Sequence, residues 1–204
     1  MNITKLNLGG GDKWKRDNWL NLDQNINQYR LEEKLLKDID SNSIEKIFFS
    51  HALEHLLPDK ARQLLIETYR TLKPGGIIRI VVPDCEKFIK AYLNKEESFY
   101  KDNIHLSKHF NSLKDTIIEM GGNKNDFNAE SQIGHYFFWD QYSLTWLLLC
   151  ANYENIVIQN FGKSLDKEMT EIATMDSESG MPINGFDNPL TEPISIYIEA
   201  LKPF

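Results

Sequence analysis

Two apolar segments constrain the fold of this chain most strongly. One leads into a run of glycines, and the other ends on an acidic residue. The segment at 6–8 leads into Gly9, Gly10 and Gly11, and the segment at 19–22 ends on Asp23. In a parallel sheet, neighbouring strands end at one edge, where nucleotide-like ligands bind. Glycines let the backbone approach such a ligand closely, and a carboxylate such as that of Asp23 can accept both hydroxyls of a ribose. The sequence therefore predicts a nucleotide-like site at this edge.

Strand and helix patterns alternate along the first half of the chain, which predicts an α/β fold with a parallel sheet covered by helices. The helix that starts at Pro58 is the most clearly marked. Proline suits a first turn, Asp59 suits the helix dipole, and Gly75-Gly76 end the pattern. The predicted strands cover 3–8, 19–23, 45–50, 77–82, 155–160 and 194–200, with a weaker one near Leu35-Leu36.

Two polar stretches interrupt this pattern. We expect a single domain over 1–204, with a lid insertion at about 94–134 and a substrate-side excursion at about 162–193. A helix is expected between them, over roughly 140–151. Excursions of this kind carry substrate-specificity loops. The lid insertion contains one amphipathic helical pattern, formed by Leu106, Phe110, Leu113, Ile117 and Met120 and closed by Gly121-Gly122.

Charge and cysteine content narrow the class of protein. A net charge of −7 over 204 residues argues against a nucleic-acid partner, and the short basic run at 13–16 is interpreted as a solvated turn. Cys85 and Cys150 cannot form a disulfide framework or a cysteine metal site, which fits a reducing compartment. No signal peptide or membrane span is evident. We expect a cytoplasmic monomer or homodimer without stable membrane insertion.

The spacing after the glycines distinguishes two kinds of ligand. A dinucleotide fingerprint needs a third glycine inside a helix whose N-terminus faces the pyrophosphate. Residues 12–18 contain no such glycine and leave barely one helical turn before the next strand. A ligand without phosphates fits this connection better than a pyrophosphate does.

Further strand-end motifs resemble those of class I S-adenosylmethionine-dependent methyltransferases. The similarity is greatest to a small type 11-like subgroup, in which a Trp-x-Asn-x-Asp strand follows the glycines. The motifs are SHALEHL at 50–56, LKPGG at 72–76 and VVPD at 81–84, and the resemblance covers roughly 4–92 and, more loosely, 134–160. It implies a doubly wound, mostly parallel seven-stranded sheet with an antiparallel last strand. It also implies transfer of a methyl group from S-adenosylmethionine.

The resemblance assigns roles to individual residues. Gly9 and Gly11 would border the methionine part of the cofactor, and Asp23 would bind the ribose hydroxyls. Trp14 or Trp19 would cover the side left open by the short connection at 12–18, unless that side stays open. The residues expected at the cofactor are Gly9, Gly10, Gly11, Asp23, Glu32 (as the adenine ligand), Ser50 and His51.

The expected acceptor is a hydroxyl of a small molecule or carbohydrate, as in tailoring of surface glycans or nucleotide sugars. Such an acceptor must lose its proton, and histidine suits that task near neutral pH. His135 is the first candidate for this base and His51 the second. Asp84 and Tyr136 are candidate substrate contacts, although Asp84 is equally suited to cap the helix after it and Tyr136 to pack in the core.

Other interpretations of these residues stay open. His51-Ala52-Leu53-Glu54-His55 also matches the H-x-x-E-H pattern of inverted zinc peptidases. That chemistry needs both histidines on one helix and a third ligand. The sequence shows no convincing third ligand, so no metal is expected. His55 is interpreted as structural. A partner subunit or sensor that binds the cofactor without catalysis, and a nicotinamide oxidoreductase, are the alternative functions.

Overall fold

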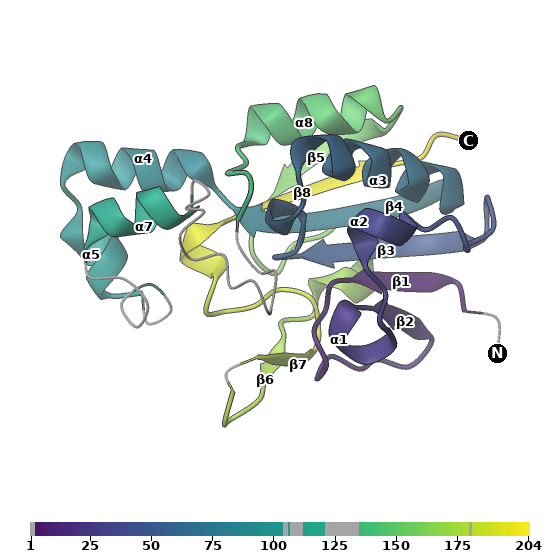
Figure 1. Cartoon of the computed structure of the whole chain (residues 1–204), viewed down its shortest axis with the longest axis horizontal. Coiled ribbons are helices and arrows are strands. Elements are labelled where there is room, and N and C mark those ends of the chain that lie inside the picture. Colours follow the sequence, from purple (N-terminus) through teal and green to yellow (C-terminus); the bar gives the residue numbers. More distant parts are fainter. Residues whose placement is uncertain (1–2, 104–105, 107–111, 121–134, 180) are drawn as a thin grey trace.

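The central feature of the fold is a six-stranded sheet with the order β2-β1-β3-β4-β8-β5 (Figure 1). The computed structural model describes residues 3–103, 106, 112–120, 135–179 and 181–204. Strands β1 to β4 are parallel, and β8 runs antiparallel to both β4 and β5. The mostly parallel sheet and its antiparallel last strand are therefore confirmed. The strands are β1 (Lys5–Leu8), β2 (Trp19–Leu22), β3 (Ile44–Ser50), β4 (Leu72–Pro83), β5 (Glu154–Gln159) and β8 (Ser195–Leu201).

The prediction of a seventh strand near Leu35-Leu36 is wrong. These residues follow the one-turn helix α2 (Leu31–Lys34) and have φ angles of 49° and 55°. Two consecutive left-handed residues cannot continue an extended strand. Both side chains are buried in the main core, so the apolar pair packs under the sheet edge without extending it.

Helices cover one face of the sheet. Helix α3 (Pro58–Thr71) has its proline in the first turn and buries Ala61, Leu64 and Leu65 along one stripe. Helix α8 (Gln141–Cys150) lies beside it and begins with a capping box between Asp140 and Ser143. Together with α2 they enclose the main hydrophobic core.

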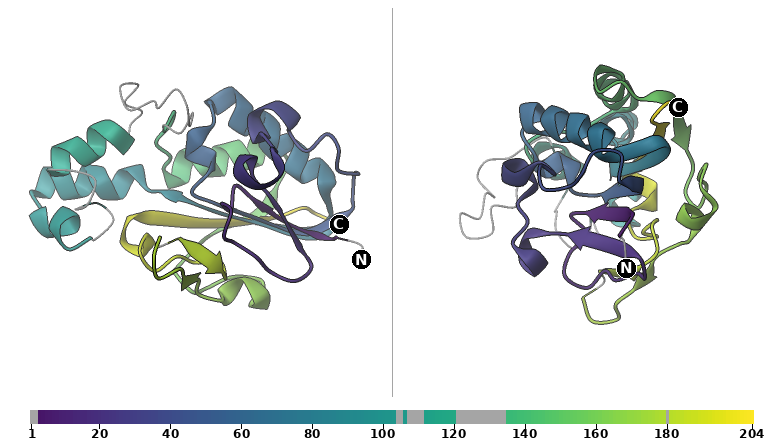
Figure 2. Two further views of the ribbon diagram at one scale, coloured as in Figure 1. Left: turned by 60° about the horizontal axis from the view of Figure 1, so that its bottom comes forward. Right: turned by 90° about the vertical axis from the view of Figure 1, so that its right-hand side faces the viewer.

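The opposite face is covered mainly by the excursion at 162–193 (Figure 2). It contains two short strands, β6 (Thr174–Met175) and β7 (Pro182–Asn184), and the 3-10 turn η3 (Lys167–Thr170). A second cluster of aromatic and aliphatic side chains fills the space beneath it, including Trp14, Trp19 and Phe186. An irregular segment thus packs where a second helical layer was expected.

A fully buried arginine attaches this excursion to the sheet. Arg79 lies in the middle of β4, and its guanidinium donates to both carboxylate oxygens of Asp187, each at 2.7 Å, and to Glu199 of β8 at 2.6 Å. All three side chains have no exposed surface. Because an unpaired charge is costly in the interior, these contacts hold the excursion against the sheet.

Three further helices project beyond the carboxyl ends of the strands (Figure 1). They are α4 (Cys85–Asn94), α5 (Glu97–Lys101) and α7 (Leu113–Met120). Of the amphipathic pattern predicted in the lid insertion, Leu113, Ile117 and Met120 lie on α7, whereas Leu106 is buried and precedes this helix. Phe110, Gly121 and Gly122 lie outside the described residues. Among the described helices, none has the length and apolar character needed to cross a membrane.

Candidate functional site

The register of the sheet places three predicted site residues side by side at its carboxyl edge. Leu8 of β1 pairs with Leu22 of β2 and with Phe49 of β3. The next residue on each strand, which is Gly9, Asp23 or Ser50, therefore stands at the carboxyl edge of the sheet. This is the juxtaposition that the strand-end motifs predicted.

The glycine loop has little room for side chains. Gly9 and Gly11 both have φ of +72°, which favours glycine. A Cβ on Gly9 would lie 2.5 Å from Cβ of Ala52, and one on Gly10 would lie 2.0 Å from Nδ2 of Asn7. The loop therefore forms a tight, concave stretch of backbone at the end of β1.

Two polar side chains of the neighbouring segment hold this loop. Asn21 accepts from the amide of Gly10 at 3.2 Å and donates to the carbonyl of Gly11 at 2.8 Å, while Asp23 accepts from the amide of Gly11 at 3.0 Å. The sequence analysis assigned no role to Asn21. The sequence contained a signal for it: residues two apart on a strand face the same side, so Asn21 faces the same side as Asp23.

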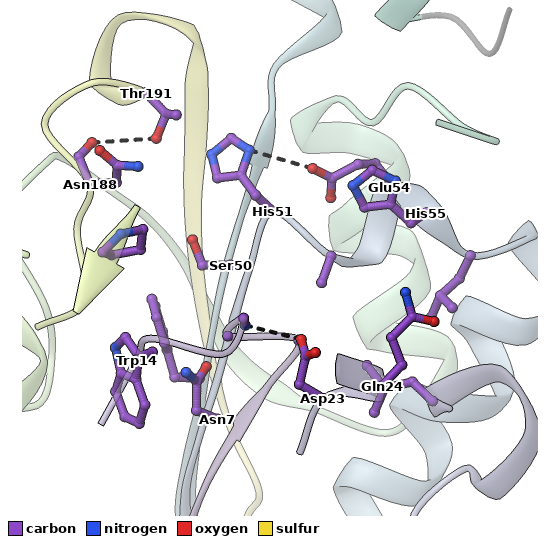
Figure 3. A pocket seen from close by; sticks show the side chains of 18 of the residues that line it. Asn7, Trp14, Asp23, Gln24, Ser50, His51, Glu54, His55, Asn188 and Thr191 are labelled. Carbon is purple, nitrogen blue, oxygen red and sulfur yellow. Dashed lines mark hydrogen bonds and ion pairs between the residues drawn. The ribbon is translucent and has the colours of Figure 1, made fainter. Parts of the chain in front are cut away.

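The glycine loop and Asp23 line a cavity of about 830 Å³, within the range of small-ligand sites. In Figure 3, Asp23 and Gln24 lie on one side of it, and His51, Glu54 and His55 lie together on another. The cavity brings together every predicted site residue except Asp84. These are Gly9, Gly10, Gly11, Asp23, Glu32, Ser50, His51, His135 and Tyr136.

Asp84 has a structural position. Its carboxylate accepts from the amide of Glu86 at 3.0 Å and caps the N-terminus of α4. The adjacent Pro83 lines the cavity, whereas Asp84 does not. The contact between Asp84 and a substrate stays a prediction that this geometry does not favour.

Trp14 and the excursion at 162–193 close the side of the cavity beside the glycine loop. The indole of Trp14 is buried and donates to the carbonyl of Gly185 at 2.8 Å. Lys13 and Arg16 pair with Asp176 and Glu171 of the excursion. The interpretation of 13–16 as a solvated turn is therefore wrong, because its tryptophan is buried and two of its cations are paired.

A buried acid lies among three histidines at the end of β3. Glu54 is 1% exposed and belongs to the 3-10 turn η1 (Leu53–His55). Burial opposes ionisation of Glu54, but contact with His51 and the charges of His55 and His135 outweigh it and lower its pKa to about 2. Sequence reasoning treated Glu54 as part of a motif and gave it no role of its own.

Backbone contacts fix His135 in this cluster across 80 positions of sequence. The amide of Tyr136 donates to the carbonyl of Glu54 at 2.8 Å, and the rings of His135 and His55 meet edge to face with centroids 4.7 Å apart. His51 has φ of +47°, a conformation uncommon for a non-glycine residue and frequent at functional sites. Its Nε2 lies 3.0 Å from Oγ of Ser195.

Comparisons with known proteins identify the fold. The profile of the methyltransferase domain family matches residues 15–80, which carry β2, β3, α3 and part of β4. A S-adenosylmethionine-dependent methyltransferase from Archaeoglobus fulgidus has a TM-score of 0.52 at 16% identity, covering 97% of this chain and 85% of that one. The chain has the class I S-adenosylmethionine-dependent methyltransferase fold. A search of curated proteins finds no match to the sequence.

Two other solved structures match this chain at lower similarity. A possible histamine N-methyltransferase from Thermotoga maritima is 17% identical, with 90% of this chain and 63% of that one covered and a TM-score of 0.43. Phosphoethanolamine N-methyltransferase 2 from Haemonchus contortus, in complex with S-adenosylmethionine, is 13% identical, with 98% and 48% covered and a TM-score of 0.47. This chain thus spans less than two thirds of the length of either protein.

The cavity suits S-adenosylmethionine, the cofactor of the methyltransferases that this chain resembles in fold. A Cβ on Gly9 or Gly10 would overlap Ala52 or Asn7, so glycine is needed for the loop to lie where it does in the cavity wall. Asn7 lines the same cavity, and within the described residues neither of its buried amide atoms finds a hydrogen-bond partner. Such atoms are costly unless a ligand pairs with them. The glycine loop, Asn7 and Asp23 would hold the cofactor.

Proposed function

We propose that this methyltransferase transfers the methyl group of S-adenosylmethionine to a hydroxyl oxygen of a small polar molecule, with a sugar or nucleotide sugar as the leading class. The cofactor supplies an activated methyl on a sulfonium that is already a good leaving group. The protein must therefore align the acceptor, exclude water and dispose of the acceptor's proton.

The single observation that carries this proposal is the histidine cluster in the cavity wall. His51, His55 and His135 surround Glu54 in the same cavity as the glycine loop and Asp23. Groups that handle protons near neutral pH are needed for a hydroxyl acceptor, since the neutral hydroxyl is a poor nucleophile. Among them, His135 and His51 keep the roles that the sequence analysis gave them.

The remaining lining supports a polyhydroxylated acceptor. Asn188 and Thr191 line the cavity on the side of the excursion, near His51 in Figure 3. Amide and hydroxyl groups pair with sugar hydroxyls. The excursion at 162–193 thus supplies the acceptor side of the site.

The test measures S-adenosylhomocysteine formation with purified protein, S-adenosylmethionine and a panel of acceptors. The panel pairs nucleotide sugars and monosaccharides with their deoxy analogues and includes primary amines. We expect turnover with a hydroxyl acceptor, loss of turnover with the analogue that lacks that hydroxyl, and a product heavier by one CH₂. Turnover with amines and with no hydroxyl acceptor would refute oxygen as the acceptor atom. Cofactor binding without turnover on any acceptor would favour the sensor.

A further inference from the structure

Glu54, His55 and His135 have the composition of a metal site. One ligand atom of each lies within 4.8 Å of those of the other two. One carboxylate oxygen and two imidazole nitrogens form a ligand set that divalent transition metals such as Zn²⁺ prefer. The site takes Glu54 and His55 from the H-x-x-E-H segment, and the fold adds His135 in place of His51.

The buried carboxylate is a second, independent indication. Among the described residues, no side chain or amide donates a hydrogen bond to either oxygen of Glu54, and both oxygens are buried. Nδ1 of His51 lies 3.4 Å from Oε1 of Glu54. One long contact leaves most of the hydrogen-bonding capacity of this buried carboxylate unused, and a coordinated cation would offset that cost.

The spacing of the three groups allows coordination after small movements. Bonds of about 2.1 Å place the ligand atoms of a tetrahedral ion about 3.4 Å apart. The observed separations of up to 4.8 Å therefore have to close by roughly an ångström, which rotation of the two imidazole rings provides. His55 and His135 are both partly exposed in the cavity wall.

We infer that Glu54, His55 and His135 bind one divalent transition-metal cation at the edge of the cofactor cavity. Three protein ligands leave at least one position open, and all three residues line the cavity. His51, which contacts both Glu54 and Ser195, orients the carboxylate and is a positioning residue.

The role of the cation rests on the proposed function. A hydroxyl of the acceptor that occupies the open position would have its pKa lowered, as a metal lowers the pKa of bound water. Its proton would leave to solvent, and an electron pair of the oxygen would form the new bond to the methyl carbon. The bond from that carbon to sulfur would break, its electron pair would stay on sulfur, and S-adenosylhomocysteine would leave. The cation would then take over the task that the sequence analysis assigned to a histidine base.

Zinc titration of the full chain, freed of metal with a chelator, tests the site. We expect one equivalent of Zn²⁺ to bind, with visible absorption bands when Co²⁺ replaces it. Glu54→Gln, His55→Gln and His135→Gln should each weaken binding by about tenfold or more. The control is Glu97→Gln on α5, an exposed acid paired with Lys101, which should bind Zn²⁺ like the unaltered protein.

Two outcomes would overturn the inference: the absence of saturable binding, or binding that both histidine variants leave unchanged. Glu54 is buried and its variant can fail to fold, so thermal midpoints are measured and the histidine variants decide. Methyl transfer by protein that binds no metal would overturn the site and leave the proposed function intact. Metal binding that the histidine variants weaken, without any methyl transfer, would support the site and refute the proposed function.

Discussion

The amide of Gly11 donates a hydrogen bond of 3.0 Å to Oδ2 of Asp23 and joins two strand-end motifs into one structure. The glycine loop and the acid are therefore positioned by each other before any ligand arrives. Preorganisation of this kind lowers the entropy that binding would otherwise lose. The relationship also makes Asp23 the most direct probe of the cofactor site.

Asp23→Ala should weaken binding of S-adenosylmethionine by tenfold or more, because it removes both the proposed ribose ligand and the support of the loop. Hydrogen bonds to charged groups contribute about 1.5–3 kcal/mol each. Isothermal titration measures the change. Asp12→Ala removes an exposed acid from the same loop and serves as the matched control. Undiminished binding by Asp23→Ala would refute the ribose role.

Gly9→Ala should destabilise the protein more than Gly162→Ala. Both glycines have positive φ, +72° and +67°, so both variants carry a similar backbone cost of about 1 kcal/mol. A Cβ on Gly9 would also lie 2.5 Å from that of Ala52, whereas one on Gly162 meets nothing within 4 Å. Urea unfolding of the two variants isolates the effect of the contact. Equal losses of stability would show that the loop relaxes freely.

His135→Ala should keep its affinity for S-adenosylmethionine and lose turnover by about 10²- to 10⁴-fold. His135 lies in the histidine cluster, where the ring of His55 packs against it, while the glycines and Asp23 sit on other strands. Titration calorimetry and single-turnover assays measure the two quantities separately. An unchanged methylation rate would show that His135 is neither the base nor a metal ligand on which turnover depends.

Arg79→Met should destabilise the protein by about 3–5 kcal/mol, because it leaves the buried carboxylates of Asp187 and Glu199 without their cation. Since Phe186 and Asn188 flank Asp187 and line the cavity, cofactor or acceptor binding should weaken as well. Arg70→Met, at a partly exposed arginine of α3, is the control. Denaturant unfolding gives the comparison, and a loss below 1 kcal/mol would contradict the role of Arg79 as an anchor.

Glu168→Gln should make the protein less sensitive to acid. Burial opposes ionisation of Glu168, but Trp19, Lys5 and Lys46 donate to it and lower its pKa well below the usual range. A lowered pKa in the folded state means that the carboxylate stabilises the fold fully above its unfolded value of about 4.3 and loses this effect as pH falls. Unfolding free energies at pH 7 and pH 3 should therefore differ less in Glu168→Gln. An unchanged difference would contradict this assignment.

The local sequence was sufficient to predict those features in which a motif lies within a single helix, strand or loop. Hydrophobic pattern predicted the strand before Gly9, and a proline predicted the start of α3. The family resemblance predicted the antiparallel C-terminal strand. Asn21 was missed although its position was readable, two residues before Asp23 on the same strand. The prediction of a strand at Leu35-Leu36 was wrong because an apolar dipeptide fits a strand and a buried turn equally well. The left-handed backbone of this pair is set by the residues that surround it.

The sequence by itself determined that glycines and an acid meet at the carboxyl edge of a parallel sheet, because the order and polarity of the strands dictate that edge. The tertiary structure alone decided that His135 joins Glu54 and His55, and that Arg79 anchors the excursion over the second face. These contacts connect residues 80 or more positions apart, and no local periodicity encodes which distant loop returns to a given strand end.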